Sequence, residues 1–258
     1  MTHWTDRLFR EQGDIFAETF AERFDAAEAE GDDLLALLAD EYDHRPDRTL
    51  DVACGVGRHV IALADRGCHA EGLDFSAEYV ERARDRADDR GLDDRTAFHH
   101  ADMRDLAEWG ADRGPYDLVT ILWNSLGYYD RATDEAVLAA VRDLLADDAP
   151  LVVEMGNKDF YLADDQPAAV NEESGRLTVD QRTYDVETGR FHTTAHWFDA
   201  TDDGYEYLDT LEWEQRMYAP VVLRELCLDA GFESVDLYAD FDGRDLRRES
   251  PTVVVVAR

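Results

Sequence analysis

Short apolar runs alternate with longer amphipathic segments between residues 48 and 156, and this alternation constrains the fold more than any other feature. The runs have the length of strands, and the segments between them show helical spacing of apolar residues. The predicted strands are 48–53, 69–75, 96–101, 116–123 and 150–156, and the predicted helices are 57–66, 77–90, 103–109 and 132–146. Ser76 is a suitable N-cap, and Gly67 and Gly91 end two of the helices. Such alternation predicts a parallel sheet covered by helices on both faces.

The pattern changes after the fifth predicted strand. Residues 171–217 hold three segments that alternate polar and apolar side chains, 176–185, 190–200 and 204–217. A period of two with turn residues between the segments predicts an antiparallel meander. A helix ending at Gly231 follows, and strands are expected at 234–239 and 252–258.

The first 45 residues have a helical pattern that Pro46 ends. Apolar residues recur at roughly helical spacing at Leu8, Phe9, Ile15, Phe16 and Phe20, and a second, short helix is expected over 32–42. The predicted domains are an N-terminal helical cap (1–45), an α/β domain (46–156 and 218–258) and an antiparallel β insertion or lid (157–217).

The charge of the chain limits its partners. Asp and Glu number 60 against 26 Lys and Arg, which gives a formal net charge of −34 at pH 7. The acids are spread along the chain, and Lys158 is its one lysine. A polyanion needs clustered Lys and Arg, so we expect no nucleic-acid partner. Such a surface repels itself in dilute buffer and resembles that of cytosolic proteins of extreme halophiles.

The cysteines and the apolar runs indicate a compartment. Cys54, Cys68 and Cys227 are scattered, without metal-ligand or redox spacing. The sequence does not open on a basic region followed by an apolar stretch, and no apolar run approaches the roughly 20 residues of a membrane span. We therefore expect a cytoplasmic protein with no membrane partner and no metal site.

A buried acid before a glycine turn is the main local signal of a binding site. The stretch LDVACGVG places Asp51 inside a predicted buried strand, followed by Gly55 and Gly57. Gly-x-Gly allows a ligand to lie against the backbone of the turn. The dinucleotide fingerprint requires a further glycine where this chain has Val60. A ligand with a positive charge and polar donors would explain the acid.

Further carboxylates follow the next strands. Ligands of open parallel sheets bind outside the carboxyl ends of the strands. Asp74 lies about 20 residues past the turn, where an acid can hold ribose hydroxyls. Phe75 offers a ring to a purine face, and Asp102 offers an acceptor to its amino group. Several carboxylates at one end of a sheet suit a ligand with cationic groups and not free phosphates.

Four motifs together resemble a known family. LDVACGVG, GLDFS, HADM and YDLVTILWNSLGYY, in this order and spacing, are similar to the class I S-adenosylmethionine-dependent methyltransferases over about residues 48–156. The resemblance implies an α/β, Rossmann-like seven-stranded sheet with its last strand antiparallel and helices on both faces. It also implies a small antiparallel β insertion after strand 5, and S-adenosyl-L-methionine as the cofactor.

The resemblance also implies roles for individual residues. Asp51 would lie near the methionine end of the cofactor, Asp74 would bind the ribose, and Asp102 would meet the adenine amino group. Phe75 and Met103 would sandwich the adenine. The implied cofactor-binding residues are Asp51, Ala53, Cys54, Gly55, Gly57, Arg58, Asp74, Phe75, Ser76, Asp102, Met103, Leu122, Trp123 and Asn124.

The implied reaction is methyl transfer to a nitrogen or oxygen of a small-molecule acceptor, by a monomer or homodimer. The acceptor must lose a proton, and the candidate bases at the mouth of the sheet are Tyr128, Glu154, His196 and Asp240.

Other functions stay open. One alternative is a methyltransferase that acts on RNA or protein, and another is a non-catalytic protein that binds S-adenosylmethionine. WNSLGYY stands where many DNA methyltransferases have an Asn/Asp-Pro-Pro-aromatic motif, which argues against a base-flipping enzyme. Val60 and Asp51 disfavour a nicotinamide oxidoreductase.

Overall fold

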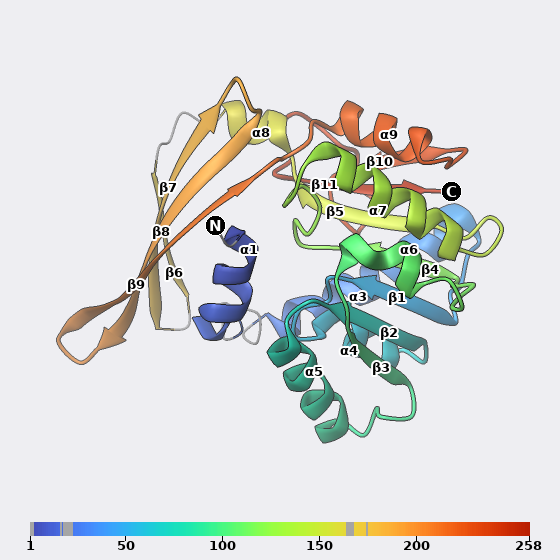
Figure 1. Cartoon of the computed structure of the whole chain (residues 1–258), viewed down its shortest axis with the longest axis horizontal. Coiled ribbons are helices and arrows are strands. Elements are labelled where there is room, and N and C mark those ends of the chain that lie inside the picture. The colour runs from blue at the N-terminus through green and yellow to red at the C-terminus, as the bar shows by residue number, and fades with distance from the viewer. Residues whose placement is uncertain (1–2, 16, 18–22, 164–167, 174) are drawn as a thin grey trace.

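A mixed sheet forms the centre of the molecule (Figure 1). The computed structural model describes residues 3–15, 17, 23–163, 168–173 and 175–258. Within these residues the sheet has seven strands in the order β10-β11-β5-β4-β1-β2-β3. They are β1 (Arg48–Val52), β2 (His69–Asp74), β3 (Thr96–His100), β4 (Leu118–Ile121), β5 (Leu151–Gly156), β10 (Val235–Tyr238) and β11 (Thr252–Ala257). β11 runs antiparallel to both β5 and β10, so the predicted sheet with an antiparallel last strand is confirmed.

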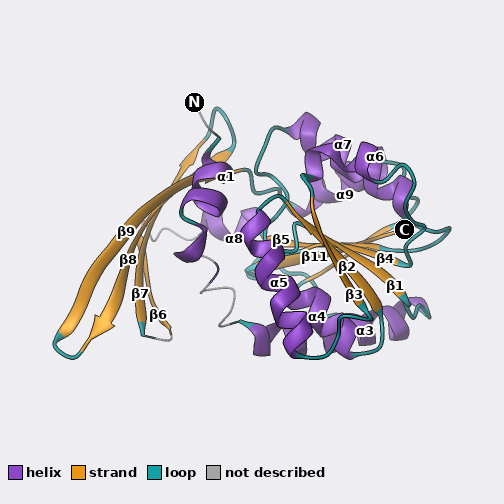
Figure 2. Ribbon diagram, turned by 60° about the horizontal axis from the view of Figure 1, so that its bottom comes forward, coloured by secondary structure: helices purple, strands orange, loops and turns teal. Residues whose placement is uncertain are grey.

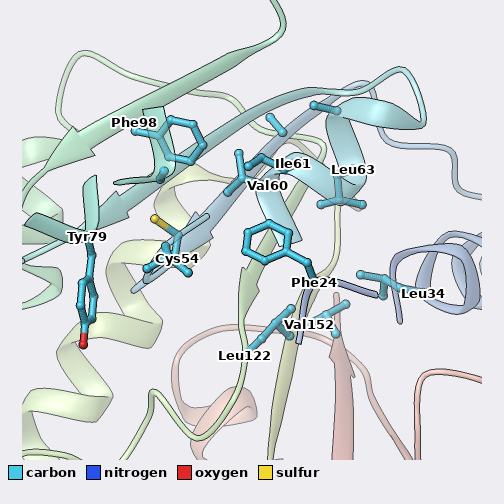
Figure 3. Close-up of a cluster of buried hydrophobic side chains, with 14 of the residues drawn as sticks. Phe24, Leu34, Cys54, Val60, Ile61, Leu63, Tyr79, Phe98, Leu122 and Val152 are labelled. Carbon is cyan, nitrogen blue, oxygen red and sulfur yellow. The ribbon is translucent and has the colours of Figure 1, made fainter. Parts of the chain in front are cut away.

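Helices cover both faces of this sheet (Figure 2). One face carries α3 (Phe24–Tyr42), α4 (Arg58–Asp65) and α5 (Ala77–Asp89), and the other carries α6 (Leu106–Trp109), α7 (Arg131–Leu144) and α9 (Pro220–Asp229). Phe24, Leu34 and Ile61 belong to the apolar cluster on the first face (Figure 3). Leu138 and Leu226 belong to a second cluster on the opposite face. The apolar runs arise because the central strands β1, β4 and β5 are buried between two such layers.

The strand order reverses between β1 and β4. From β1 the chain proceeds outward through β2 and β3, and it then returns to place β4 and β5 on the other side. Loops leaving neighbouring strands in opposite directions open a crevice at their carboxyl ends. The fold therefore places the loops after Val52 and Ile121 beside a natural binding site.

A second sheet is inserted after β5, and it has one strand more than the sequence predicted. It consists of β6 (Ala168–Glu173), β7 (Arg176–Asp185), β8 (Arg190–Thr201) and β9 (Gly204–Gln215), all antiparallel. Strand β6 was missed because AAVNEE lacks a period of two. A short helix, α8 (Lys158–Ala163), precedes it. The N-terminal helix α1 (Trp4–Asp6) lies between this sheet and the α/β body (Figure 1).

The N-terminal region differs from the expected helices in two places. Residues Arg7–Glu11 form η1, a π-helix. Helix α3 begins at Phe24 and not near residue 32. Gly31 does not interrupt this helix, and it lies where α3 packs closely against α4. A Cβ on Gly31 would lie 3.3 Å from the Cβ of Ala62. Phe16 and Phe20 lie outside the described residues.

Two predictions from the sequence concern the chain as a whole: that it has no membrane span, and that it divides into three parts. No helix in the described residues is both long and apolar enough to span a membrane. The division into cap, α/β domain and insertion stays a prediction.

A substitution at Gly57 tests the close packing of the turn between β1 and α4. Its φ is 78°, and an added Cβ would lie 2.7 Å from the Phe98 ring and 2.8 Å from the Ala83 Cβ. Gly57→Ala should lower the free energy of unfolding by about 2–5 kcal/mol, since left-handed strain adds to overpacking. Urea unfolding in multimolar KCl measures this loss.

Gly67→Ala is the matched control. Gly67 has a φ of 98°, but an added Cβ would meet no atom within 4 Å. Its cost should be the backbone strain alone, about 1–2 kcal/mol. Equal losses in the two variants would contradict the packing argument.

Candidate functional site

A cavity lies at the carboxyl ends of β1, β2 and β4, and its empty volume of about 740 Å³ includes space that is open to solvent. The predicted cofactor residues that line it are Asp51, Ala53, Cys54, Gly55, Arg58, Asp74, Phe75, Asp102, Met103, Leu122 and Trp123. The other lining residues are Phe9, Val56, His59, Leu73, Tyr79, Ala101, Ser125, Tyr128 and Tyr129. The cavity therefore combines the strand-end acids with an aromatic enclosure.

The turn after β1 brings backbone to the cavity. Ala53, Gly55 and Gly57 have φ values of 61°, 56° and 78°, so the turn passes through the left-handed region three times before α4 begins. Cys54 lies between them and fills a space beside Gly72, where an added Cβ would lie 2.7 Å from the Cys54 Sγ. Burial raises the pKa of the Cys54 thiol, which therefore stays protonated. The thiol fills space, and the neighbouring backbone faces the ligand site.

Asp74 joins the first two turns. Its Oδ2 accepts a hydrogen bond from the Gly55 amide at 2.9 Å, and its Oδ1 accepts one from the Ser76 amide at 2.8 Å. Burial raises the pKa of Asp74 to about 6, against the lowering effect of these two bonds. A carboxylate has more acceptor positions than two amides occupy, so Asp74 can still accept hydrogen bonds from a ligand.

Asp51 is 3% exposed and accepts a hydrogen bond from Thr120 Oγ1 at 2.8 Å. Burial raises its pKa to about 7, and Asp74 adds a smaller effect in the same direction, while Thr120 and Arg58 lower it. A cationic group of a ligand would stabilise the ionised form. This supplies a chemical reason for an acid inside a buried strand.

Arg58 provides the complementary charge. The residue is 5% exposed, and its guanidinium lies 4.2 Å from the centre of the Trp123 ring. Nη1 is 3.6 Å from Glu30 Oε2, but neither Nη atom makes a hydrogen bond within the described residues. Buried guanidinium donors without acceptors are costly. A carboxylate-bearing ligand such as S-adenosylmethionine fits this donor set.

Asp102 forms hydrogen bonds with Arg104. Both of its carboxylate oxygens accept from the Arg104 guanidinium, at 3.0 and 2.6 Å, and Oδ1 also accepts from the Arg104 amide. Burial opposes ionisation, but the Arg104 hydrogen bonds hold the pKa of Asp102 below its usual value. Arg104 in turn lies over the Tyr129 ring, 4.5 Å from its centre. Asp102 is thus a fixed, ionised acceptor at the cavity edge.

The N-terminal segment covers the cavity, which the sequence did not reveal. Phe9 on η1 contacts Phe75, Tyr79 and Tyr128, with ring centroids 5.7–6.4 Å apart. Trp4 meets Tyr128 edge-on at 5.2 Å. The apolar spacing of this segment indicated a buried face, but it did not indicate what that face covers.

Three residues of the predicted cofactor set lie behind the cavity lining. Gly57 packs against Phe98, as described above. The Ser76 hydroxyl caps α5 by accepting from the Tyr79 amide. Asn124 Oδ1 accepts from the Gly156 amide at 2.6 Å, and this bond ties the loop after β4 to the end of β5.

The four candidate bases have different surroundings. Tyr128 lines the cavity, and burial raises the pKa of its phenol well above its usual value, so it is a hydrogen-bond donor at neutral pH. Glu154 is not among the residues that line the cavity, and its Oε2 accepts from the Trp123 amide at 2.8 Å. His196 is bonded to Thr210 on the inserted sheet, and Asp240 forms an ion pair with Arg244. Tyr128 alone of the four borders the described cavity, and the role of each stays a prediction.

The described residues contain no group of three or more His, Cys, Asp or Glu side chains placed to hold a metal ion.

Comparison with known proteins identifies the domain. Residues 49–148 match a family model described as "Methyltransferase domain". A dTDP-3-amino-3,6-dideoxy-alpha-D-glucopyranose N,N-dimethyltransferase of Streptomyces fradiae is 34% identical over 121 residues, which cover 46% of this chain and 44% of that protein. The chain thus spans less than half the length of this curated relative.

Two further proteins match most of the chain. A glycine/sarcosine N-methyltransferase of Parasynechococcus marenigrum is 28% identical over 242 residues, which cover 88% of this chain and 78% of that protein. The crystal structure of an S-adenosylmethionine-dependent methyltransferase from Clostridium acetobutylicum has a TM-score of 0.78 at 15% identity and covers 95% of this chain and 98% of that one.

The chain therefore contains a methyltransferase domain, and its fold is that of the class I S-adenosylmethionine-dependent methyltransferases. The prediction of a methyltransferase domain is confirmed, and the comparisons support S-adenosylmethionine as its cofactor.

The buried carboxyl of Asp51 should make stability depend on pH. Its pKa rises from 3.8 to about 7 on folding, so the folded state binds the proton more tightly than the unfolded chain. This contribution is fully present below pH 4 and is lost as the pH rises through 7. We expect the unfolding free energy of the wild type, relative to Asp51→Asn, to fall across that window.

Urea unfolding at a series of pH values measures the difference. Asp85→Asn, which removes an exposed acid from α5, is the matched control. A pH-independent difference for Asp51→Asn would contradict the assignment of a raised pKa.

Proposed function

We propose that this protein transfers a methyl group from S-adenosylmethionine to a nitrogen of a small-molecule acceptor. The observation that carries the proposal is the charge arrangement of the cavity. Buried Asp51 and Asp74 lie in one cavity with the buried guanidinium of Arg58, whose Nη atoms have no hydrogen-bond partner in the described residues. These groups complement an amino acid ammonium, a ribose and a carboxylate.

We assign a group of this chain to each polar part of the cofactor. Asp51 and the backbone after β1 hold the methionine ammonium, and Arg58 holds the carboxylate. Asp74 accepts from the ribose hydroxyls, and Asp102 accepts from the adenine amino group. When bound, the cofactor supplies an electrophilic methyl group on a sulfonium. The buried walls keep water from this group and hold the acceptor in line with it.

Nitrogen is the favoured accepting atom because the two curated relatives described above are named as N-methyltransferases. An amine attacks through its lone pair, so it must reach the site deprotonated or lose its proton there. Tyr128 borders the cavity as a neutral phenol and can orient an acceptor by a hydrogen bond. We assign it this orienting role and assign no general base.

The net charge of the chain argues against a methyltransferase that acts on RNA. A net charge of −34 opposes the approach of RNA, and basic side chains are dispersed among more than twice as many acids. A protein that binds the cofactor without turnover would use the same cavity, so only a turnover measurement distinguishes it from an enzyme.

Cofactor binding should depend on Asp74. We expect calorimetric titration in multimolar KCl to give a micromolar dissociation constant for S-adenosylmethionine. Asp74→Asn should weaken binding about tenfold or more, since it removes a charged acceptor of hydrogen bonds worth roughly 1.5–3 kcal/mol. Asp85→Asn removes the same charge from the surface of α5 and should bind like the wild type. No binding by folded wild-type protein would refute the cofactor assignment.

Turnover should be specific for small amines. The protein is incubated with S-adenosylmethionine and glycine, sarcosine, an amino sugar nucleotide, a catechol, total RNA or a protein mixture. Formation of S-adenosylhomocysteine, with one added methylene on the acceptor by mass spectrometry, reports transfer. We expect product with an amine and none with RNA or protein. Transfer to the catechol alone would overturn the choice of nitrogen, and binding without any transfer would favour the non-catalytic alternative.

A further inference from the structure

The inserted sheet holds the loop after β4 by its backbone. Five carbonyl groups between Asn124 and Tyr129 accept hydrogen bonds from the ends of β8 and β9. Gln215 Nε2 donates to the carbonyls of Asn124 and Leu126, and the Arg216 amide donates to that of Gly127 at 2.9 Å. Arg190 donates through Nη2 to the Tyr128 carbonyl at 2.9 Å and through Nη1 to the Tyr129 carbonyl at 2.8 Å.

This loop needs external partners because it is irregular. Residues 122–130 belong to no helix or strand, and Trp123 and Asn124 are non-glycine residues with φ values of 58° and 61°. Backbone carbonyls outside regular structure must find other donors when buried. Two consecutive left-handed residues also store strain, which persists only where the surroundings enforce it.

The donors are well shielded from water. Gln215 is 6% exposed, and the side chain of Arg190 is 12% exposed. Arg190 Nε lies 3.2 Å from Glu214 Oε1, so a neighbouring carboxylate on β9 orients the guanidinium. Buried hydrogen bonds from a charged donor are stronger than exposed ones. We call these five hydrogen bonds to the carbonyls of residues 124–129 the clamp. Their burial makes the clamp a rigid attachment between the inserted sheet and the loop.

The approach of the two segments is unusually close at one point. A Cβ on Gly127, whose φ is 89°, would lie 2.0 Å from the Arg216 carbonyl oxygen. Only glycine allows the residue that follows β9 to contact the loop here. On its other side, the Gly127 amide donates to the buried Asp134 Oδ1 of α7 at 3.2 Å. The loop is thus fixed between the inserted sheet and the α/β body.

The clamped loop also forms part of the cavity wall, because Ser125, Tyr128 and Tyr129 line it. We propose that Arg190 and Gln215 are positioning residues for methyl transfer: by holding the backbone of residues 124–129 they fix the wall against which the acceptor is bound. This proposal rests on the proposed function for the identity of the ligand. It assigns the inserted sheet a structural part in building the site, besides any covering role.

Two substitutions test the clamp. Arg190→Gln removes the paired donors to Tyr128 and Tyr129, and Gln215→Leu removes the donors to Asn124 and Leu126. We expect each to raise the rate of amide hydrogen exchange in a peptide covering residues 122–130. Each should lower kcat/KM for the amine about tenfold or more, because small misplacements of a binding wall are costly. The affinity for S-adenosylmethionine should stay nearly that of the wild type.

Arg176→Gln is the matched control. Arg176 lies on β7 of the same sheet, its side chain is 16% exposed, and its Nε donates to Asp199 Oδ1 at 3.0 Å. This variant should leave the exchange of residues 122–130 and kcat/KM unchanged. Arg190→Lys keeps one charged donor, so it should recover part of the lost activity. It also provides a folded variant if Arg190→Gln does not fold.

The outcomes separate this proposal from the proposed function. Unchanged hydrogen exchange in both clamp variants would overturn the clamp whether or not any acceptor is found. Faster exchange with unchanged kcat/KM would overturn the positioning role. If the wild type methylates no acceptor, the proposed function fails, and the exchange rates with the cofactor affinities still decide whether the sheet holds the loop.

Discussion

The two hydrogen bonds that Asp74 accepts from backbone amides hold the binding end of the sheet together. One amide belongs to Gly55 in the turn after β1, and the other belongs to Ser76 at the start of α5. A single buried carboxylate thereby fixes the relative positions of two loops that leave neighbouring parallel strands. The left-handed turn before α4 and the cap of α5 depend on this carboxylate, since each hydrogen bond to a charged acceptor contributes roughly 1.5–3 kcal/mol.

The cavity concentrates charge in a place where charge is costly. Burial raises the pKa values of Asp51 and Asp74, and it lowers the pKa of Arg58. The protein itself supplies only some of the hydrogen-bond and ion-pair partners that these side chains can accept. A ligand that carries both an ammonium and a carboxylate would supply the missing partners. Binding energy is then available from interactions that the folded chain alone leaves incomplete.

Local sequence predicted the α/β domain well because its signals are local. Strand length, apolar spacing and the Ser76 cap report directly on backbone conformation, and the strand-end acids follow from the topology. The π-helix at Arg7–Glu11 and the cover formed by Phe9 were missed, because helical spacing does not specify which surface a helix meets. The hydrogen bond from the Trp123 amide to Glu154 was also missed, because a contact between residues so far apart in the sequence has no local signal.

The clamp on residues 124–129 binds main-chain carbonyls and no side chain of this loop. The path of the loop backbone therefore does not depend on which side chains line the cavity. Side chains at Ser125, Tyr128 and Tyr129 can be exchanged without removing any of the atoms that Arg190 and Gln215 bind. If the acceptor binds against this loop as proposed, substitutions at these three positions would change which acceptors fit while the backbone of the loop keeps its path. The inserted sheet thus gives the domain a fixed frame in which substrate preference is free to evolve.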